Sequence, residues 1–152
     1  LPMRWKANVT VAAVIEKDNR FLMIEEESDG EIVINQPAGH LEKDESIIAA
    51  VKREVQEETA WEFQPSYLVG IYLYPSKNNN ITYLRICFSG QCVNYKPEQK
   101  LDEGIIQAMW LSKEELEANS ANLRSPLVMQ CVNDFLSGQQ YSLDLLHHYE
   151  NE

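Results

Sequence analysis

One segment, Asp44 to Trp61, constrains the fold of this chain more than any other. Its apolar residues recur at the three- and four-residue spacing of one helix face, and Asp44 is placed to cap the helix start. These apolar residues are Ile47, Ile48, Val51 and Val55. Another face consists of Arg53, Glu54, Glu57 and Glu58. Because three carboxylates within about one turn repel one another, the pattern predicts an amphipathic helix whose acidic face either attracts a positive partner or is only solvated.

Stretches rich in β-forming residues lie on both sides of this helix. Residues 9–15 and 20–24 are predicted to form a hairpin, and residues 32–34 are predicted to form a short strand before the helix. Residues 67–74 and 81–92 are predicted strands joined by a polar turn. We expect these strands to carry most of the core.

Two more helices are predicted near the end of the chain. The first starts at Ser112, which fits a capping box with Glu115, and the second starts at Ser125-Pro126 and stops at Gly138. Strands and helices do not alternate strictly, which favours an α+β or mixed-sheet sandwich over a doubly wound parallel sheet. Since 152 residues suit one hydrophobic core, we expect a single domain over 1–152, with a C-terminal helix and tail from about residue 125.

Charge and composition exclude several functional classes. The chain has 13 Lys and Arg against 24 Asp and Glu, a formal net charge of −11, which has the wrong sign for a groove that binds duplex nucleic acid. No apolar run approaches the roughly 18 residues of a membrane span, and the first residues lack the pattern of a signal peptide. Three cysteines without a CxxC pair indicate free thiols rather than a disulfide framework or a zinc site. We therefore expect a cytoplasmic protein, with a monomer favoured.

The spacing around the acidic helix carries a specific resemblance. Gly39 is followed by five residues and Glu45, and then by seven residues and REVQEETAW, residues 53–61. This resembles the box of the Nudix hydrolase family, which has a glycine, a glutamate, an Arg-Glu pair and a Glu-Glu pair in the same register. One specified position differs, because Ala60 stands where the family has glycine. That glycine serves a left-handed helix exit, which costs other residues about 1 kcal/mol, so Ala60 should alter the exit and remove no catalytic group.

The resemblance implies a fold and a chemistry. The family folds as an α/β/α sandwich with a mixed β-sheet and a loop-helix-loop catalytic motif, here residues 39–61, that holds a divalent metal against a diphosphate. The implied ligands of Mg²⁺, or alternatively Mn²⁺, are the Gly39 carbonyl and the carboxylates of Glu54, Glu57 and Glu58. Glu45 and Arg53 are implied to brace the helix or the ligands. Mg²⁺ itself prefers oxygen ligands and keeps substrate phosphates in its shell, which agrees with hydrolysis of a phosphoanhydride bond in a small phosphorylated substrate.

The general base has two candidate positions. Family members differ in whether a box carboxylate or a later loop residue accepts the proton from water. Glu54 is the first candidate, and Glu103 is the second, with Asp102 close behind, because their loop precedes an apolar run that ends at Trp110. The alternative interpretation of Asp102 and Glu103 is an exposed acidic loop.

Substrate contacts must come from outside the box. Arg85 is a cation in an otherwise apolar strand, so it either points to solvent or binds a ligand phosphate. Tyr72, Tyr74 and Tyr83 are candidates for stacking on a heterocycle, although strand alternation sends some aromatic residues into the core. Arg124, just before a capped helix, either helps to bind an anion or pairs with a surface carboxylate.

Beyond the box, the chain resembles the NudJ-type phosphatase subfamily in residues 35–42, 122–128 and 137–141. That resemblance implies release of orthophosphate from nucleoside tri- and diphosphates, and from thiamine pyrophosphate or its hydroxymethylpyrimidine pyrophosphate precursor. One alternative is a pyrophosphohydrolase of dinucleoside polyphosphates, sugar nucleotides or RNA 5′ ends. Another is a non-catalytic ligand-binding module of the same fold, which is disfavoured because all the charged residues of the box are present.

Overall fold

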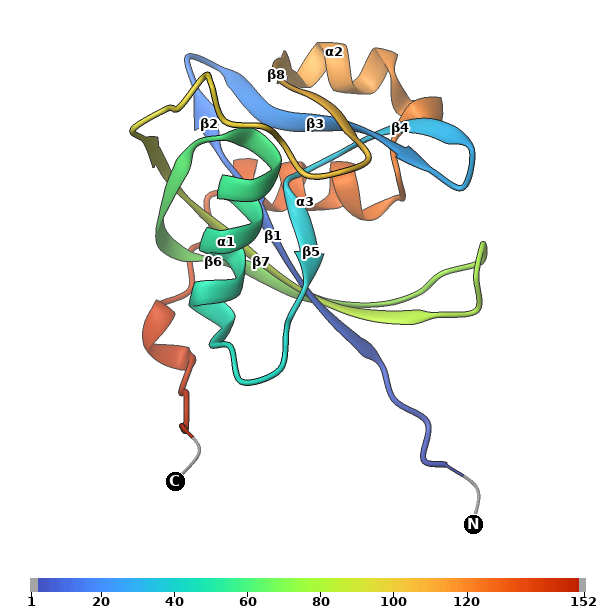
Figure 1. Ribbon diagram of the computed structural model, residues 1–152, viewed down its shortest axis with the longest axis vertical. Coiled ribbons are helices and arrows are strands. Elements are labelled where there is room, and N and C mark those ends of the chain that lie inside the picture. The colour runs from blue at the N-terminus through green and yellow to red at the C-terminus, as the bar shows by residue number, and fades with distance from the viewer. Residues whose placement is uncertain (1–2, 151–152) are drawn as a thin grey trace.

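The computed structural model describes residues 3–150. Leu1, Pro2, Asn151 and Glu152 lie outside this range, so the prediction that no signal peptide is present falls partly on residues that are not described. In chain order (Figure 1), the elements are β1 (Asn8–Val14), β2 (Glu16–Lys17), β3 (Arg20–Ser28), β4 (Glu31–Asn35), β5 (Ala38–His40), α1 (Ile47–Thr59), β6 (Glu62–Pro75), β7 (Thr82–Val93), β8 (Ile105–Ser112), α2 (Lys113–Ala118), η1 (Ser120–Asn122), α3 (Leu127–Leu136) and η2 (Leu143–Leu145).

The strands form one mixed sheet and one antiparallel sheet. In the first sheet the strand order is β5-β1-β7-β6, and β1 runs parallel to β7 but antiparallel to β5. In the second sheet β3 pairs in antiparallel fashion with β2, β4 and β8. The register of the first sheet sets Thr10 opposite Arg85 and Tyr74 opposite Tyr83. The predicted mixed sheet is therefore confirmed.

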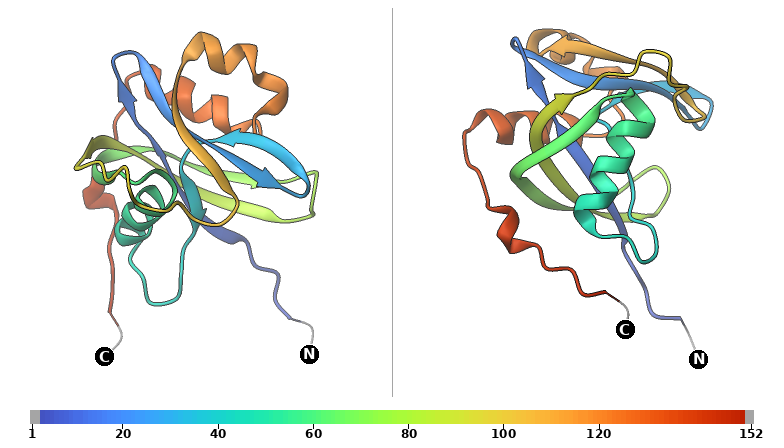
Figure 2. Two further views of the ribbon diagram at one scale, coloured as in Figure 1. Left: turned by 45° about the horizontal axis from the view of Figure 1, so that its top comes forward. Right: turned by 60° about the vertical axis from the view of Figure 1, so that its left-hand side comes forward.

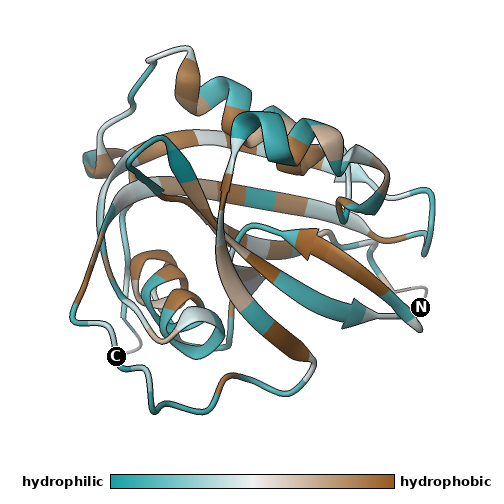
Figure 3. Ribbon diagram, turned by 90° about the horizontal axis from the view of Figure 1, so that it is seen from above, coloured by the Kyte–Doolittle hydropathy of each residue, from teal (hydrophilic) through white to brown (hydrophobic). Residues whose placement is uncertain are grey.

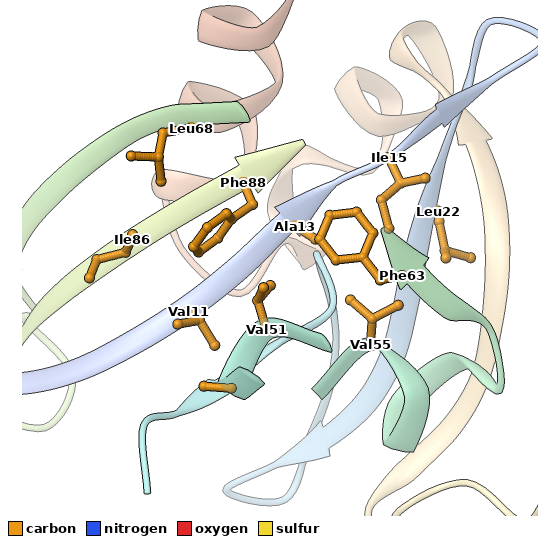
Figure 4. Packing of buried hydrophobic residues seen from close by; sticks show 11 residues of the cluster. Val11, Ala13, Ile15, Leu22, Val51, Val55, Phe63, Leu68, Ile86 and Phe88 are labelled. Atoms are coloured by element: carbon orange, nitrogen blue, oxygen red, sulfur yellow. The ribbon is translucent and has the colours of Figure 1, made fainter. Parts of the chain in front are cut away.

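Helices cover both faces of the mixed sheet. Alternation along β1 turns Val11 toward α1, where it belongs to one core cluster with Val51 and Phe88 (Figure 4). Ala12 turns the other way and belongs to a second cluster with Val128 of α3. Figure 2 shows α1 and α3 on opposite sides of the strands, and Figure 3 shows the longer loops as largely hydrophilic. This architecture confirms the predicted α+β class, an α/β/α sandwich in which α1 is the helix of the loop-helix-loop motif.

The ends of α1 differ from the prediction in one respect. The prediction that Asp44 caps the helix is wrong, because the Ser46 hydroxyl accepts the hydrogen bond from the Ala49 N–H at 3.0 Å and Asp44 lies in the preceding turn. At the other end, Ala60 adopts a left-handed conformation, with φ 64° and ψ 13°. Alanine thus ends the helix in the geometry that glycine adopts more easily, and no side chain of the acidic face is lost.

Several strands differ from the sequence prediction. Residues 9–15 do not form a long hairpin with residues 20–24, because only the two residues of β2 pair with β3 and β1 joins the other sheet. Gly39, expected in a loop, lies in β5, and residues 105–112, predicted only as an apolar run, form β8. β1 is a central strand buried on both faces, and such strands read as continuous apolar runs that do not reveal their partners.

The two C-terminal helices begin close to the predicted positions. Ser112 and Glu115 form the predicted capping box, with hydrogen bonds of 3.1 Å and 3.0 Å between the side chain of each residue and the backbone of the other. Before α3, the Leu127 N–H donates to the Ser125 hydroxyl at 3.2 Å, and Gly138 follows the helix with φ 87°. Within residues 3–150, no helix has both the length and the apolar character that a bilayer crossing requires.

Candidate active site

The acidic face of α1 packs against the short strand β5. The Ala38 N–H donates to Glu58 Oε1 at 2.8 Å. A Cβ atom at Gly39 would overlap the carboxylate of Glu54, so the close approach of helix and strand depends on glycine. Pairing of β5 with β1, with Gly39 opposite Val11, holds this backbone at the edge of the mixed sheet. Sheet edge and helix face therefore bring three of the predicted box residues together.

Arg53 links the loop before α1 to the carboxylates of the helix. Its guanidinium makes a bidentate ion pair with Glu45, at 2.7 Å from Nε and 3.0 Å from Nη2. Nη1 lies 2.8 Å from Glu54 Oε1 and 3.2 Å from Glu57 Oε2. The pairing with Arg53 lowers the pKa of Glu45 and raises that of Arg53. A fourth carboxylate, that of Glu42, lies 3.6 Å from Nη1, so Arg53 is the counter-ion of four carboxylates.

We call Glu54, Glu57 and Glu58 the carboxylate ridge. Glu54 and Glu58 are only 8% and 7% exposed. Burial raises the pKa of Glu58 to about 9, although the hydrogen bond from the Ala38 N–H acts to lower it. The neighbouring carboxylates of Glu54, Glu26 and Asp102 add to the rise. Burial also raises the pKa of Glu54, although Arg53 opposes it, and burial followed by the charge of Asp102 raises the pKa of Glu57. Without a cation, the ridge therefore disfavours the fully ionised state of its three carboxylates, and a bound cation would favour that state.

The ridge has the ligand types of a divalent-cation site, but its carboxylates do not yet converge on one point. Among residues 3–150, no three Asp, Glu, His or Cys side chains already converge around one point as metal ligands do. Arg53 instead holds one oxygen each of Glu54 and Glu57. The donors are all oxygens, which suits a hard cation such as Mg²⁺. The residues therefore fit such a cation, because Arg53 binds one oxygen of Glu54 and one of Glu57 and each carboxylate has a second oxygen that can act as a ligand.

A cavity of about 640 Å³ opens beside β5. We call its lining residues on the central strands β1 and β7, namely Thr10, Tyr83 and Arg85, the floor of the cavity. We call its lining residues on β3, β4, the turn between β6 and β7 and the segment before α3 its walls. The sequence-predicted residues that line it are Gly39, Tyr74, Tyr83, Arg85 and Arg124. Residues of β5, β6, β7 and the segment before α3 thus meet in one cavity, which adjoins the carboxylate ridge through Ala38 and Gly39.

Arg85 lies at the floor of this cavity. It is 6% exposed, so the interpretation that it points to solvent is wrong. Its guanidinium donates to Gln36 Oε1 at 2.9 Å, to Asn35 Oδ1 at 3.3 Å and to Cys131 Sγ at 3.7 Å. No carboxylate within the described part of the chain forms an ion pair with it. A buried cation without a carboxylate partner favours an anionic group nearby.

Two of the three tyrosine candidates line the cavity. Tyr74 and Tyr83 are cross-strand neighbours, and the Tyr83 hydroxyl accepts a hydrogen bond from Asn79 Nδ2 at 2.8 Å. The His40 ring lies 6.4 Å from that of Tyr83. Tyr72 is directed elsewhere, because its hydroxyl donates to Asp134 of α3 at 2.7 Å. The aromatic surface open to a ligand therefore belongs to Tyr74 and Tyr83.

The loop between β7 and β8 places Asp102, rather than Glu103, against the ridge. The Asp102 N–H donates to the Glu57 carbonyl at 2.9 Å, and the two side chains share a hydrogen bond that contributes to the raised pKa of Glu57. Glu103 is exposed, and within residues 3–150 no hydrogen bond or ion pair joins its side chain to the ridge. Of the two loop candidates, Asp102 is the one that the structure brings to the box.

One acidic residue of the cavity was not predicted. Glu26 on β3 lines the cavity, pairs with Arg124 at 3.7 Å and raises the pKa of Glu58 through its charge. The signal in the sequence was the run of three glutamates at 25–27, because alternation in a strand sends the middle one to the face opposite its neighbours. The Glu26 pair shows Arg124 in the carboxylate-pairing role that the sequence left open.

Comparison with known proteins agrees with this geometry. The NUDIX domain model matches residues 5–131. The chain is 37% identical over 142 residues to phosphatase NudJ of Escherichia coli strain K12, which spans 93% of this chain and 92% of that protein. It is 52% identical to the structure of a NUDIX hydrolase from Nitrosomonas europaea, with a TM-score of 0.95 over 97% of this chain and 100% of that chain.

A more distant structure shares the fold alone. It is a bifunctional NMN adenylyltransferase/ADP ribose pyrophosphatase from Francisella tularensis, complexed with AMP and a Mn ion, with 19% identity and a TM-score of 0.72. The match covers 88% of this chain and 42% of that chain. The family match and the two closer relatives confirm the resemblance found in residues 39–61. The chain therefore belongs to the Nudix family and is a hydrolase that acts on phosphoanhydride substrates.

Proposed function

We propose that this hydrolase is a Mg²⁺-dependent phosphatase that releases orthophosphate from nucleoside tri- and diphosphates, and from thiamine pyrophosphate or hydroxymethylpyrimidine pyrophosphate. The observation that carries the proposal is the position of the carboxylate ridge beside a cavity that contains a buried Arg85 and two tyrosines. Similarity to phosphatase NudJ over most of both chains supports release of a terminal phosphate. Mn²⁺ is the proposed substitute for Mg²⁺.

The carboxylate ridge and the Gly39 carbonyl are the proposed ligands of the cation. When bound, Mg²⁺ offsets the negative charge of the phosphates and acidifies a water molecule. Arg53 fixes the direction of Glu54 and is itself held by the bidentate pair with Glu45. Glu54, whose carboxylate lies against Gly39 of β5, is the proposed acceptor for the proton of the attacking water. Asp102 is the proposed alternative acceptor and is preferred to Glu103.

Substrate orientation is assigned to the cavity floor. Arg85 is proposed to bind a phosphate that is not being transferred, because a buried guanidinium without a carboxylate partner is stabilised by an anion. Arg124 is proposed to do the same from the wall when it leaves Glu26. Tyr74 and Tyr83 are proposed to stack on the heterocycle of the substrate. Stacking accepts purines as well as the smaller pyrimidine of thiamine.

Product analysis tests this proposal. Water attack on the terminal phosphorus should convert GTP to GDP and orthophosphate, GDP to GMP and orthophosphate, and thiamine pyrophosphate to thiamine monophosphate and orthophosphate. Orthophosphate and pyrophosphate are measured separately for each substrate with Mg²⁺ present. If pyrophosphate is the sole product from GTP and both diphosphates are inert, the phosphatase assignment is wrong, although the Nudix assignment stands.

Cation binding should stabilise the protein measurably. Because a ligand that binds only the folded state adds about 2.7 kcal/mol at a concentration 100-fold above its Kd, saturating Mg²⁺ should raise Tm by roughly 5–10 °C. Glu57→Gln should reduce this shift to less than about half, whereas Glu117→Gln, an exposed residue of α2, should leave it unchanged. Differential scanning fluorimetry with and without Mg²⁺ measures both variants. A Tm that does not respond to Mg²⁺ in the unmodified protein favours the interpretation of the acidic face as only solvated.

A further inference from the structure

The loop of residues 94–104 closes the C-terminal end of α1. It runs from β7 to β8 across that end of the helix (Figures 1 and 2). The last carbonyls of a helix have no partner within it, and here the loop supplies two backbone donors. The Lys96 N–H donates to the Ala60 carbonyl at 3.0 Å, and the Asp102 N–H donates to the Glu57 carbonyl at 2.9 Å. The loop is therefore docked on the helix turn that carries Glu57 and Glu58.

A reciprocal pair of side-chain amides strengthens this docking. Gln56 Nε2 donates to Gln99 Oε1 at 2.6 Å, and Gln99 Nε2 donates to the Gln56 carbonyl at 2.7 Å. Both side chains are partly buried, whereas Asp102, three residues further along the loop, is exposed. Gln56 directly precedes Glu57 on α1. The pair thus joins the middle of the loop to the residue next to the carboxylate ridge.

We propose that Gln56 and Gln99 form an amide clamp that positions the loop, and through it the carboxylate of Asp102, beside Glu57. Both are positioning residues, because neither contributes a group to the ridge itself. The proposal rests on the proposed hydrolase function of the ridge. Without the clamp, the Lys96 and Asp102 backbone bonds to α1 remain, as do the anchors at the two ends of the loop, the stacking of Tyr95 on Trp61 and the bond from the Glu27 N–H to the Gly104 carbonyl. The stretch between these ends, which carries Asp102, is exposed and highly charged, so Asp102 should lie beside Glu57 for a smaller part of the time.

The clamp can be tested without any activity measurement. In Gln99→Ala, the Asp102 and Lys96 amides should exchange with solvent deuterium at least about fivefold faster, because their hydrogen bonds open with the loop. Amides of β1 and β7 should keep their exchange rates. Gln107→Ala is the matched control, since it removes a glutamine whose side chain donates to Glu25 on the other sheet. Unchanged exchange at Asp102 and Lys96 in Gln99→Ala, measured by NMR, would overturn the clamp.

A double-mutant cycle tests the positioning role. With GDP and Mg²⁺, Gln99→Ala should lower kcat by about 5- to 10-fold and leave KM within about twofold, and the control Gln107→Ala should match the wild type. In an Asp102→Asn background, Gln99→Ala should lower kcat no further, because its effect acts through Asp102. An equal loss in both backgrounds would mean that the pair only stabilises the fold, and would overturn the positioning role.

A second variant keeps the clamp testable if Gln99→Ala folds poorly. Measurements on the wild type distinguish failure of the clamp from failure of the proposed function. Gln99→Glu keeps the acceptor for Gln56 Nε2 but loses the donor to the Gln56 carbonyl, so it should show smaller changes of the same kind in both experiments. Exchange rates and kcat equal to those of the wild type in this variant would count against the clamp. Failure of the wild type to release orthophosphate from GDP would contradict the proposed function, while the exchange experiment would still decide the clamp.

Discussion

Glu58→Gln and Glu57→Gln are each expected to lower kcat by at least about 100-fold. Each change removes one anionic oxygen ligand and keeps the size of the side chain, so the cation is held more weakly and the attacking water is less activated. Steady-state hydrolysis of GDP, with Mg²⁺ titrated to saturation for each variant, measures the effect. The titration matters because weaker cation binding alone would be rescued by excess Mg²⁺, whereas a misplaced cation would not.

Stability provides the internal control for this prediction. Glu58 accepts the Ala38 N–H through one oxygen, and the glutamine amide keeps a carbonyl oxygen for that hydrogen bond. Because burial of the Glu58 carboxylate raises its pKa to about 9, the neutral amide should make the metal-free protein no less stable. A kcat loss combined with an unchanged or higher Tm would therefore locate the effect in the chemistry. Near wild-type turnover in both variants would remove the carboxylate ridge from the mechanism.

The sequence predicts α1 and its acidic face well because both follow from local rules. Apolar residues at helical spacing and fixed charged positions require no knowledge of distant contacts, and the helix spans Ile47–Thr59 within the predicted segment. The predicted N-cap is wrong because Asp and Ser are both favoured at this position, and tertiary contacts rather than local sequence decide which of Asp44 and Ser46 caps the helix. The resemblance implies a left-handed helix exit at position 60, and Ala60 adopts that conformation, so the expected alteration of the exit is not seen in its backbone angles.

The pairing of strands and the partners of Arg85 are not predictable in the same way. β1 pairs with β7, more than 70 residues further along the chain, and its apolar run carries no information about that distance. Arg85 stands out as a cation in an apolar strand, but Asn35 and Gln36, which accept its hydrogen bonds, come from the segment around β4. Glu26 and Asp102 reach the ridge through the second sheet and a loop, so only the fold distinguishes them from other surface acids.

Gly39→Ala is the second change expected to have a large effect. It replaces no charged residue and acts by displacing one. The added Cβ would overlap the carboxylate of Glu54, which is the far end of a side chain and therefore moves more easily than the strand backbone. Moving that carboxylate breaks the 2.8 Å ion pair with Arg53 and shifts a proposed ligand and base. Since a misplacement of about 1 Å at a reacting centre can cost about 100-fold, kcat should fall by roughly that factor.

The matched control is Gly70→Ala, a substitution of the same kind within a strand of the same sheet. Its Cβ would meet the Tyr72 hydroxyl, which lies toward α3 and outside the cavity at β5, so kcat should stay within about twofold of the wild type. Neither glycine has a positive φ, so backbone strain does not separate the two variants. Steady-state kinetics and Tm are measured for both. The proposed roles of Glu54 as ligand and base both require its carboxylate to stay at its present position against β5. If Gly39→Ala keeps the wild-type kcat, both roles are therefore wrong.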